Sequence, residues 1–226
     1  MSTLDTFLPS VRPWAPGVPD ATAHKNIRLA AIEFCERTRL WRFEDDYDVT
    51  IETCNAGIFV PNGAALHDIE MVMFDGRELL PKATRDVDRL QTGTRWRTNG
   101  NIIGSVAGGN QMVVQPPPTS IPKYYTQIDQ NSLRVVPAMA GHVYICTRLK
   151  PTQDATEIPD FIANEYREVI GWGALGRILT IPGQSYSSPD LGAFYAQKFT
   201  EKLDRLSTKG VTGQQNAPKR SRARYF

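Results

Sequence analysis

The stretch from Ile158 to Gly183 reads IPDFIANEYREVIGWGALGRILTIPG, and its spacing of apolar residues decides the fold class. Pro159 and Asp160 are typical of a helix start, and Pro182 with Gly183 is typical of a stop. Between them apolar side chains recur every three or four residues, as on one face of a helix. The members of this stripe are Phe161, Ile162, Tyr166, Val169, Ile170, Leu175, Ile178 and Leu179. The spacing predicts one helix from about residue 159 to residue 182.

A second helix is predicted directly after this one. Ser188 suits the N-cap, Pro189 the first helical position, and Asp190 the positive end of the helix dipole. Lys209 and Gly210 are typical of its end. Its predicted apolar stripe consists of Leu191, Phe194, Tyr195, Phe199, Leu203 and Leu206. The two helices are therefore expected to lie antiparallel and adjacent.

A third helical pattern runs from about Thr22 to Leu40, near the other end of the chain. One side of it gathers Ile27, Ala30, Ala31, Phe34 and Cys35. An apolar face of this kind needs a helical partner, so we expect this helix to join the two later ones in a bundle. Residues 1–20 contain Pro9, Pro13, Pro16 and Pro19, which predicts an extended lead-in rather than a helix.

Between Trp41 and Lys150 the pattern is that of short antiparallel strands separated by turns. Asp75-Gly76 separates two apolar-rich runs and predicts a tight hairpin, while residues 143–149 alternate as a half-buried strand does. Further predicted turns are Asn99-Gly100 and Gly108-Gly109, and Pro116-Pro117-Pro118 predicts an exposed linker or edge. The fold class is thus α+β, a helical bundle with an inserted antiparallel sandwich or barrel.

This pattern divides the chain into four parts. Residues 1–42 are the lead-in and first bundle helix, residues 43–150 the inserted β domain, residues 151–210 two bundle helices, and residues 211–226 a basic arm. The composition, with 41% hydrophobic and 22% charged residues, is that of an ordinary soluble globular protein. Neither a membrane span nor a secretory signal is expected, because no long apolar run occurs.

Gly171, Gly173 and Gly176 match the G-x-G-x-x-G fingerprint of dinucleotide-binding proteins. That chemistry needs a strand leading into the glycines and a helix that starts at them, so that phosphate meets the helix N-terminus. Here the glycines lie within a helical pattern instead. The favoured interpretation is close helix packing, and no cofactor is expected.

No catalytic or metal site is expected from the other reactive residues. His24, His67 and His142 are scattered without metal-ligand spacing, and His67 and Asp68 would point to opposite faces of a strand. The cysteines at 35, 54 and 146 are an odd number without a C-x-x-C pair, which favours buried thiols over disulfides or a thiolate zinc site.

Acidic residues gather between Glu44 and Glu52, at positions 44, 45, 46, 48 and 52. Their spacing does not fit an EF-hand loop. The favoured interpretation is a solvated acidic edge, which could also receive a basic surface of another subunit. Trp41, Phe43 and Tyr47 are interleaved with the acids and suit either a core or an interface.

Charge is unevenly distributed along the chain. From residue 205 to the end there are six basic residues and no acid, so the total of +2 leaves −4 for the first 204 residues. The last basic cluster consists of Lys219, Arg220, Arg222 and Arg224, and it is followed by Tyr225 and Phe226. Two interpretations stay open: a disordered basic end, or an arm that docks through arginine and aromatic anchors.

The layout resembles the head-to-tail adaptor (connector) protein family of tailed bacteriophages. The residues that carry the resemblance are Leu8-Pro9, Ala30-Ala31 with the run Phe34 to Thr38 and Trp41, Ile158 to Phe161, Gly171 to Leu175, Ile178-Leu179, Pro182-Gly183, the helix holding Ala193, Tyr195 and Phe199, and the terminal Arg-Ala-Arg-Tyr-Phe. The resemblance covers the helical ends well and the β region poorly.

This resemblance implies a structural virion protein of the neck or tail, assembled in the host cytoplasm. Such subunits form a ring, usually a dodecamer, beneath the portal protein and above a tail or nozzle protein. It implies that residues 219–226 are the portal-docking arm. DNA would pass through the channel without sequence-specific contacts, and a mildly acidic wall would let it slide.

Two functions of other classes are compared with this one. A nucleic-acid-binding module would use a β barrel with Tyr124, Tyr125 or Trp96 as stacking platforms and the tail as a source of charge. Arg95 and Arg97 beside Trp96 are the best local support for it. A wall-degrading glycosidase would need two carboxylates at a defined separation, and no pair stands out among the many acids.

Overall fold

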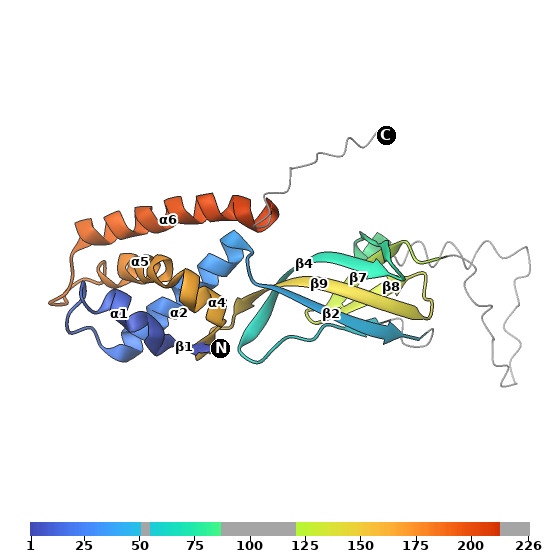
Figure 1. The fold of residues 1–226 in the computed structure, drawn as a ribbon, viewed down its shortest axis with the longest axis horizontal. Coiled ribbons are helices and arrows are strands. Elements are labelled where there is room, and N and C mark those ends of the chain that lie inside the picture. The colour runs from blue at the N-terminus through green and yellow to red at the C-terminus, as the bar shows by residue number, and fades with distance from the viewer. Residues whose placement is uncertain (51–54, 87–120, 213–226) are drawn as a thin grey trace, which may run out of the picture. The chain divides into compact units, whose positions relative to one another are not determined.

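The computed structural model describes residues 1–50, 55–86 and 121–212. These residues fall into two compact units. Of the described residues, the helical unit contains 1–42, 60–68 and 148–212, and the β unit contains 43–50, 55–59, 69–86 and 121–147. Strands β4 and β9 have residues in both units, so the chain passes from one unit to the other within continuous strands. Figure 1 shows the order of the elements.

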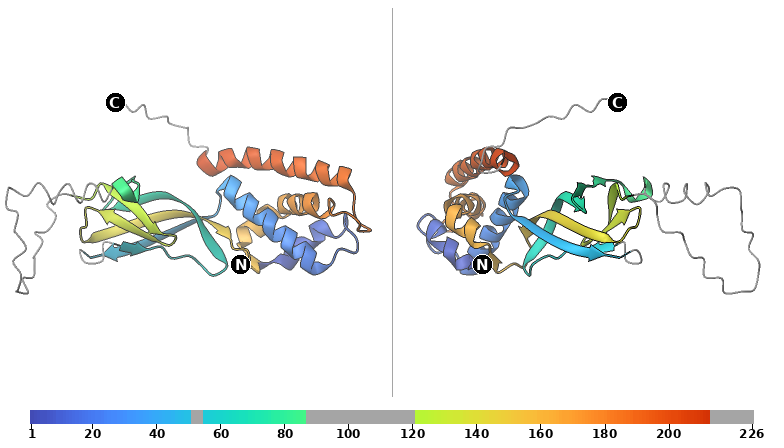
Figure 2. Two further views of the ribbon diagram at one scale, coloured as in Figure 1. Left: turned by 180° about the vertical axis from the view of Figure 1, so that it is seen from behind. Right: turned by 45° about the vertical axis from the view of Figure 1, so that its right-hand side comes forward.

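The helical unit is a bundle of helices from both ends of the chain. Its main members are α2 (Asp20–Thr38), α5 (Arg167–Ile178) and α6 (Pro189–Thr212), and each of them packs against the other two. The short helices η1 (Leu4–Phe7), α1 (Leu8–Val11) and α4 (Asp160–Glu165) complete it, with a two-stranded sheet of β1 (Ser2–Thr3) and β10 (Glu157–Ile158). Both views in Figure 2 show α6 running along the other helices.

The α2 prediction is confirmed to within two residues at each end. All five residues of its predicted apolar side are buried, with Phe34 and Ile27 among the most deeply buried side chains of the described residues. The helix ends because Arg39 adopts a left-handed conformation with φ of 55° and donates its backbone N–H to Cys35 O at 2.9 Å.

The prediction of an extended lead-in is wrong, because residues 4–11 are helical. Pro9 lies in the first turn of α1, where the missing N–H has no partner to lose. Leu4, Phe7, Leu8 and Val11 are all buried, so this short helical segment is held by its apolar contacts with the bundle. The prolines mark its boundaries rather than prevent it.

The single helix predicted for residues 159–182 is two helices. Tyr166, at φ of −122° and ψ of 16°, separates α4 from α5, and α5 ends at Ile178. The apolar period continues across the break because both helices bury residues against the same bundle. The start of α6 at Pro189 is confirmed, and its end at Thr212 agrees with the predicted end at Gly210 to within two residues.

The β unit is built mainly on two four-stranded sheets, and no barrel is closed among the described residues. One sheet has the order β2-β9-β4-β5 and the other the order β3-β8-β7-β6. The strands of the first are β2 (Arg42–Val49), β4 (Ala64–Phe74), β5 (Arg77–Glu78) and β9 (Gly141–Pro151). Those of the second are β3 (Asn55–Gly57), β6 (Leu80–Pro81), β7 (Tyr124–Asp129) and β8 (Ser132–Val136).

The fold class, an α+β helical bundle with inserted sheets that are mainly antiparallel, is therefore as predicted. The hairpin at Asp75-Gly76 is also confirmed: both residues have positive φ, and Met73 pairs with Glu78 across the turn. One strand pair differs from the expectation, because β6 lies parallel to β7. Strand β9 also differs, since residues 145–149 are buried on both faces rather than half-buried.

Several predictions lie outside the described residues. They are the turns at Asn99-Gly100 and Gly108-Gly109, the proline run at 116–118, Cys54, Glu52, and Trp96 with its two arginines. The basic arm, residues 219–226, lies outside them as well. Within the part of the chain that the structure describes, no helix is long and apolar enough to cross a membrane.

Candidate interaction surfaces

The three glycines of the G-x-G-x-x-G match lie inside α5 and face its neighbours at close range. A β-carbon at Gly171 would lie 2.8 Å from Ser10 Cβ. One at Gly173 would lie 2.9 Å from Phe199 Cζ and 3.0 Å from Ala30 Cβ. Real β-carbons essentially never approach closer than 3.0 Å, so a side chain at either position requires Ser10, or Phe199 and Ala30, to shift.

At Gly176 the approach is between backbones. A β-carbon there would lie 3.1 Å from the N, Cα and Cβ atoms of Ala196 on α6. Gly192 lies on the same contact, with Gly176 O 3.4 Å from its own hypothetical β-carbon. No strand leads into the glycines, and α5 begins at Arg167, so their N–H groups do not form the start of a helix. This geometry does not provide a phosphate-binding loop.

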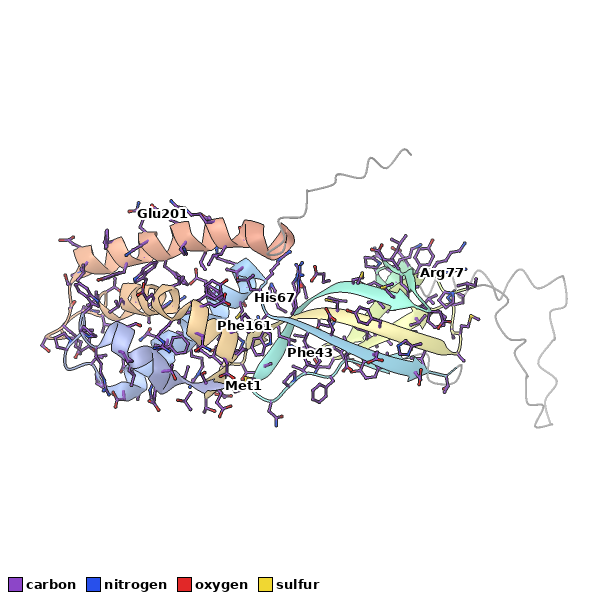
Figure 3. All side chains as sticks on the ribbon, in the orientation of Figure 1. Met1, Phe43, His67, Arg77, Phe161 and Glu201 are labelled. Atoms are coloured by element: carbon purple, nitrogen blue, oxygen red, sulfur yellow. The ribbon has the colours of Figure 1, made fainter. Side chains whose placement is uncertain are left out.

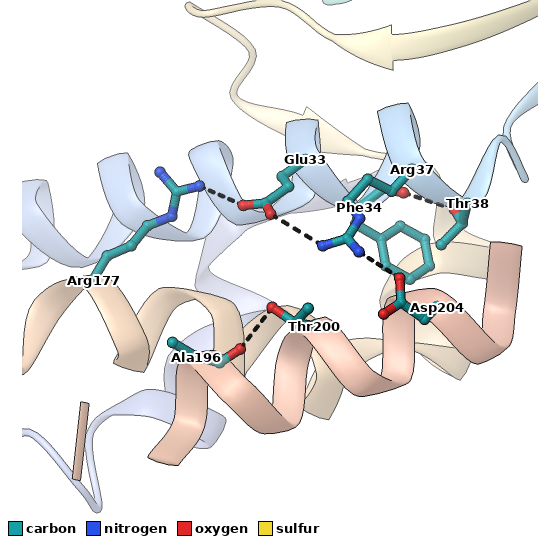
Figure 4. Close-up of polar contacts among 8 residues, drawn as sticks. All are labelled: Glu33, Phe34, Arg37, Thr38, Arg177, Ala196, Thr200 and Asp204. Atoms are coloured by element: carbon teal, nitrogen blue, oxygen red, sulfur yellow. Dashed lines mark hydrogen bonds and ion pairs between the residues drawn. The ribbon is translucent and has the colours of Figure 1, made fainter. Parts of the chain in front are cut away.

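An ion-pair ladder joins the three main helices on the surface of the bundle. Arg177 Nη2 on α5 lies 2.6 Å from Glu33 Oε2 on α2, and Glu33 Oε1 lies 3.8 Å from Arg37 Nη1. Arg37 Nη2 in turn lies 2.5 Å from Asp204 Oδ1 on α6 (Figure 4). All four side chains are at least one-third exposed, so each pair contributes little to stability. The ladder lies at the margin of the apolar contacts that hold the three helices together.

The histidines do not form a shared site in the described part of the chain. His24 Nε2 lies 2.9 Å from Asp5 Oδ1 in the helical unit. His142 lies in the β unit, where Nδ1 is 3.1 Å from Asp48 and Nε2 is 3.4 Å from Asp46. No group of three histidines, cysteines or carboxylates suited to a metal ion occurs among the described residues. Cys35 is buried, and this burial raises the pKa of its thiol.

Strand β2 carries the acidic run as a row on the edge of its sheet. Glu44, Asp46 and Asp48 are exposed, while Phe43, Asp45 and Tyr47 between them are half-buried. Tyr47 donates its hydroxyl to Asp45 Oδ2 at 2.5 Å and accepts the backbone N–H of Phe59 at 2.6 Å. Burial and the bond to Asp45 raise the pKa of Tyr47 to about 12. The sequence prediction of a solvated acidic edge is confirmed for Glu44, Asp46 and Asp48 and is wrong for Asp45, which is half-buried. Glu52 lies outside the described residues.

The neighbouring strand β9 supplies two partners of this acidic row, His142 and Tyr144. Partial burial and a hydrogen bond from its hydroxyl to Glu44 raise the pKa of Tyr144 to about 12. The neutral phenol is therefore the stable form beside the carboxylates. Phe43 contacts Phe59, whose ring centroid lies 5.9 Å away and whose side chain is exposed. Strand β2 thus has its exposed acidic row on one face and, on the other, half-buried Phe43 in contact with exposed Phe59.

A second exposed aromatic cluster lies at the start of α6. Trp14 and Phe194 are 54% and 56% exposed, and each packs against Tyr195, at ring-centroid distances of 5.8 Å and 5.5 Å. The predicted apolar stripe of α6 includes Phe194, and this prediction is wrong. A helix turns about 100° per residue, so Phe194 lies about 120° from the centre of the stripe. The exposure of Phe194 can therefore be predicted from its helical angle, whereas no local sequence pattern indicates that Trp14 is exposed.

The outward face of α6 is otherwise polar. Glu201 points away from the bundle in Figure 3, and the neighbouring exposed positions include Gln197, Thr200 and Lys202. Lys198 lies over the Trp172 ring at 3.9 Å from its centroid, which joins α6 to α5. The predicted stacking residues of the β region are poorly placed, since Tyr125 is 8% exposed and Lys82 covers the Tyr124 ring at 4.3 Å.

The described residues thus form a bundle built from both chain ends, with close small-residue helix contacts, inserted sheets and a charged edge strand. The family model described as SU10 adaptor protein matches residues 2–223 of the chain. The chain therefore belongs to the SU10 adaptor protein family, a family of phage adaptor proteins, and the resemblance inferred from the sequence is confirmed. A search of curated proteins finds no match to the chain.

Proposed function

We propose that the protein is a head-to-tail adaptor that forms a ring, most simply a dodecamer, beneath the portal protein and joins the capsid to the tail around the DNA channel. The match to the SU10 adaptor family over residues 2–223 carries this proposal. The family match includes Lys219, Arg220 and Arg222 of the basic arm and ends before Arg224, Tyr225 and Phe226. As a component of the neck or tail, the protein would assemble in the host cytoplasm.

The helical unit is the part suited to a rigid ring wall. Gly171, Gly173 and Gly176 let α1, α2 and α6 approach α5 closely, and such contacts leave little freedom for the helices to shift. Neighbouring copies would meet through heterologous contacts that close into a ring. A net charge of −4 over the first 204 residues suits a channel wall that does not retain DNA.

The arm is the part suited to the portal. Lys219, Arg220, Arg222 and Arg224 supply charge, and Tyr225 and Phe226 supply large apolar surface, which is the composition of interface hot spots. Fixing a chain segment at an interface costs conformational entropy, and anchors of this kind offset that cost. Tail-side partners, a nozzle or tail protein, would contact surfaces away from the arm.

Negative-stain imaging of the full chain mixed with the portal protein of the same genome tests the proposal. We expect rings that cap the portal with the natural chain. We expect few caps with a variant in which Lys219, Arg220, Arg222 and Arg224 become Gln, and few with Tyr225→Ala plus Phe226→Ala.

A matched control changes four exposed basic residues elsewhere, Lys25, Arg77, Lys202 and Arg205, to Gln. This control should cap the portal as the natural chain does. Absence of caps with the natural chain would contradict the adaptor function, and equal capping by all variants would remove the arm from the interface. Salt-sensitive binding to duplex DNA without portal binding would instead support the nucleic-acid-binding alternative.

A further inference from the structure

The free edge of β2 has a regular chemical pattern. Strands β2 and β9 are antiparallel, because residue numbers rise along β2 while those of their contacts on β9 fall. Trp41 O accepts from Leu149 N, Phe43 O accepts from Thr147 Oγ1, and Asp48 contacts His142. In such a ladder the residues that bond the neighbouring strand alternate with those whose N–H and C=O point away from it. With Trp41 bonded to β9, the residues whose backbone points away are Glu44, Asp46 and Asp48.

One local contact agrees with this alternation. The N–H of Asp46 donates to its neighbour Asp45 Oδ1 at 3.0 Å, rather than to a strand. In the sheet order β2 has a single neighbour, so within the described residues it is an edge strand. Its acidic side chains remain largely available to a partner, since those of Asp46 and Asp48 are 66% and 95% exposed although both contact His142.

Acidic residues on an edge protect it from pairing with another copy of itself, because like charges would lie opposite one another. The same row favours a strand that carries positive charges at every second position. In the arm, Arg220, Arg222 and Arg224 have this spacing. Residues 219–226 number eight, as do the residues of β2 from Arg42 to Val49. Period and length therefore match, and the signs of charge are opposite.

One antiparallel register satisfies both the charges and the aromatic residues. With Arg222 opposite Asp46, Arg220 falls opposite Asp48 and Arg224 opposite Glu44. The same register places Tyr225 opposite Phe43, whose ring already contacts the exposed ring of Phe59. A parallel register pairs the charges equally well but brings Tyr225 beside Val49, away from this aromatic pair. The antiparallel register is the one favoured.

We propose that the edge of β2 is the docking site for the chain's own basic arm, residues 219–226, which adds to the sheet as an antiparallel strand until the portal protein takes it over. This inference rests on the arm's proposed role at the portal, and it adds a regulatory state to it. The portal protein and β2 compete for the arm. The more tightly the arm pairs with β2, the weaker its binding to the portal protein becomes. Before assembly, the acidic row thus binds the basic, aromatic arm and keeps it from other partners.

Hydrogen–deuterium exchange of the full chain, without portal, tests the pairing. We expect the amides of residues 220–226 to exchange about tenfold more slowly in the natural chain than in Glu44→Gln/Asp46→Asn/Asp48→Asn. Three cross-strand ion pairs of ordinary strength change a local opening equilibrium by about this factor. The protection should fall when salt rises to about 1 M, where the Debye length is about 3 Å.

Two further variants make the result specific. Asp154→Asn/Asp190→Asn/Glu201→Gln removes three exposed carboxylates elsewhere and should leave the protection of the arm unchanged. Combining Glu44→Arg/Asp46→Arg/Asp48→Arg with Arg220→Glu/Arg222→Glu/Arg224→Glu should restore the protection that either triple substitution alone abolishes. Phe59→Ser should weaken it without any change of charge.

Equal exchange of the arm in the natural and neutralised chains, or loss of protection in the Asp154/Asp190/Glu201 control, would overturn the inference. The portal-capping assay is separate from this measurement. An unprotected arm with normal capping leaves the adaptor function intact and removes only the pairing of the arm with β2, whereas a protected arm without capping contradicts the portal role.

Discussion

Helix α5 and strand β2 differ in how they contact the rest of the protein. In α5, eight of twelve residues are buried, and three of these are glycines against which neighbouring helices pack. In β2, exposed and half-buried residues alternate, and the exposed ones from Glu44 to Asp48 are all acidic. Shape determines the partners of α5, whereas charge and backbone pairing determine those of β2.

This difference indicates where each segment is sensitive to change. A glycine in α5 has no spare volume around it, so added atoms force two helices apart. An acid on β2 is surrounded by water, so its removal costs little in folding and alters what the strand can bind. We therefore expect stability to depend on the helical unit and recognition to depend on the edge strand and the arm.

The largest effect is expected from opening a cavity beside α5. Phe199→Ala should lower the free energy of unfolding by about 4 kcal/mol, because this side chain is almost fully buried against Gly173. Phe194→Ala, on the same helix, should lower it by about 0.5 kcal/mol or less, because its ring is exposed. Urea denaturation measures both. Similar values for the two would contradict the assigned face of α6.

A smaller effect is expected from overfilling the same contact. Gly173→Leu should lower the free energy of unfolding by about 2 kcal/mol, because Ala30 and Phe199 occupy the space. Gly57→Leu, where no atom lies within 4 Å of the added β-carbon, is the matched control in the β unit and should change it by about 0.5 kcal/mol at most. If thermal or urea unfolding showed a larger loss of stability for Gly57→Leu than for Gly173→Leu, the contrast between the tightly packed α5 and the sheets would be contradicted.

The ion-pair ladder should matter less again. Glu33→Gln breaks the contacts with Arg177 and Arg37 and should cost about 0.5 kcal/mol, because the pairs are solvent-exposed. A double-mutant cycle with Arg177→Gln gives the coupling directly. A coupling several times larger would mean that the bundle depends on charge as much as on shape.

The last expected effect is the loss of stability when Tyr144 ionises on the acidic face of the sheet. It is absent at neutral pH and appears only in strong alkali. Tyr144 has its pKa raised from 10.0 to about 12, so its contribution to stability is complete below about pH 10 and disappears as the pH rises through about 12. Tyrosinate absorbance, taken as the difference between the natural chain and Tyr144→Phe, reports this titration. Glu44→Gln should lower the pKa of Tyr144 toward 10, and Glu201→Gln should leave it unchanged.

Much of the helical unit can be predicted from sequence because helical period and stop signals are local. The buried side of α2 and the start of α6 follow from residue spacing alone. The helices before residue 12 do not, because their stability comes from burial of Phe7 and Val11 against distant residues rather than from propensity. The break at Tyr166 is hidden for the same reason, since the apolar period continues through it.

The interaction surfaces are harder to predict. The acidic row can be found by its composition, and its place on an edge strand follows only from the pairing of β2 with β9. The contact of Phe43 with Phe59 joins residues separated by a segment of chain, and Trp14 reaches Tyr195 from the other end of the sequence. Such contacts depend on tertiary structure and leave no periodic pattern.

Native mass spectrometry of the full chain assembled with the portal protein of its genome tests the central claim most directly. A ring adaptor should give a single complex with a fixed number of copies of this chain and of the portal protein, and twelve copies of each is the simplest case. The variant lacking the aromatic anchors Tyr225 and Phe226 should give free portal and free chain. A natural chain that leaves the portal unoccupied, or binds it in a few scattered copies, would contradict the account.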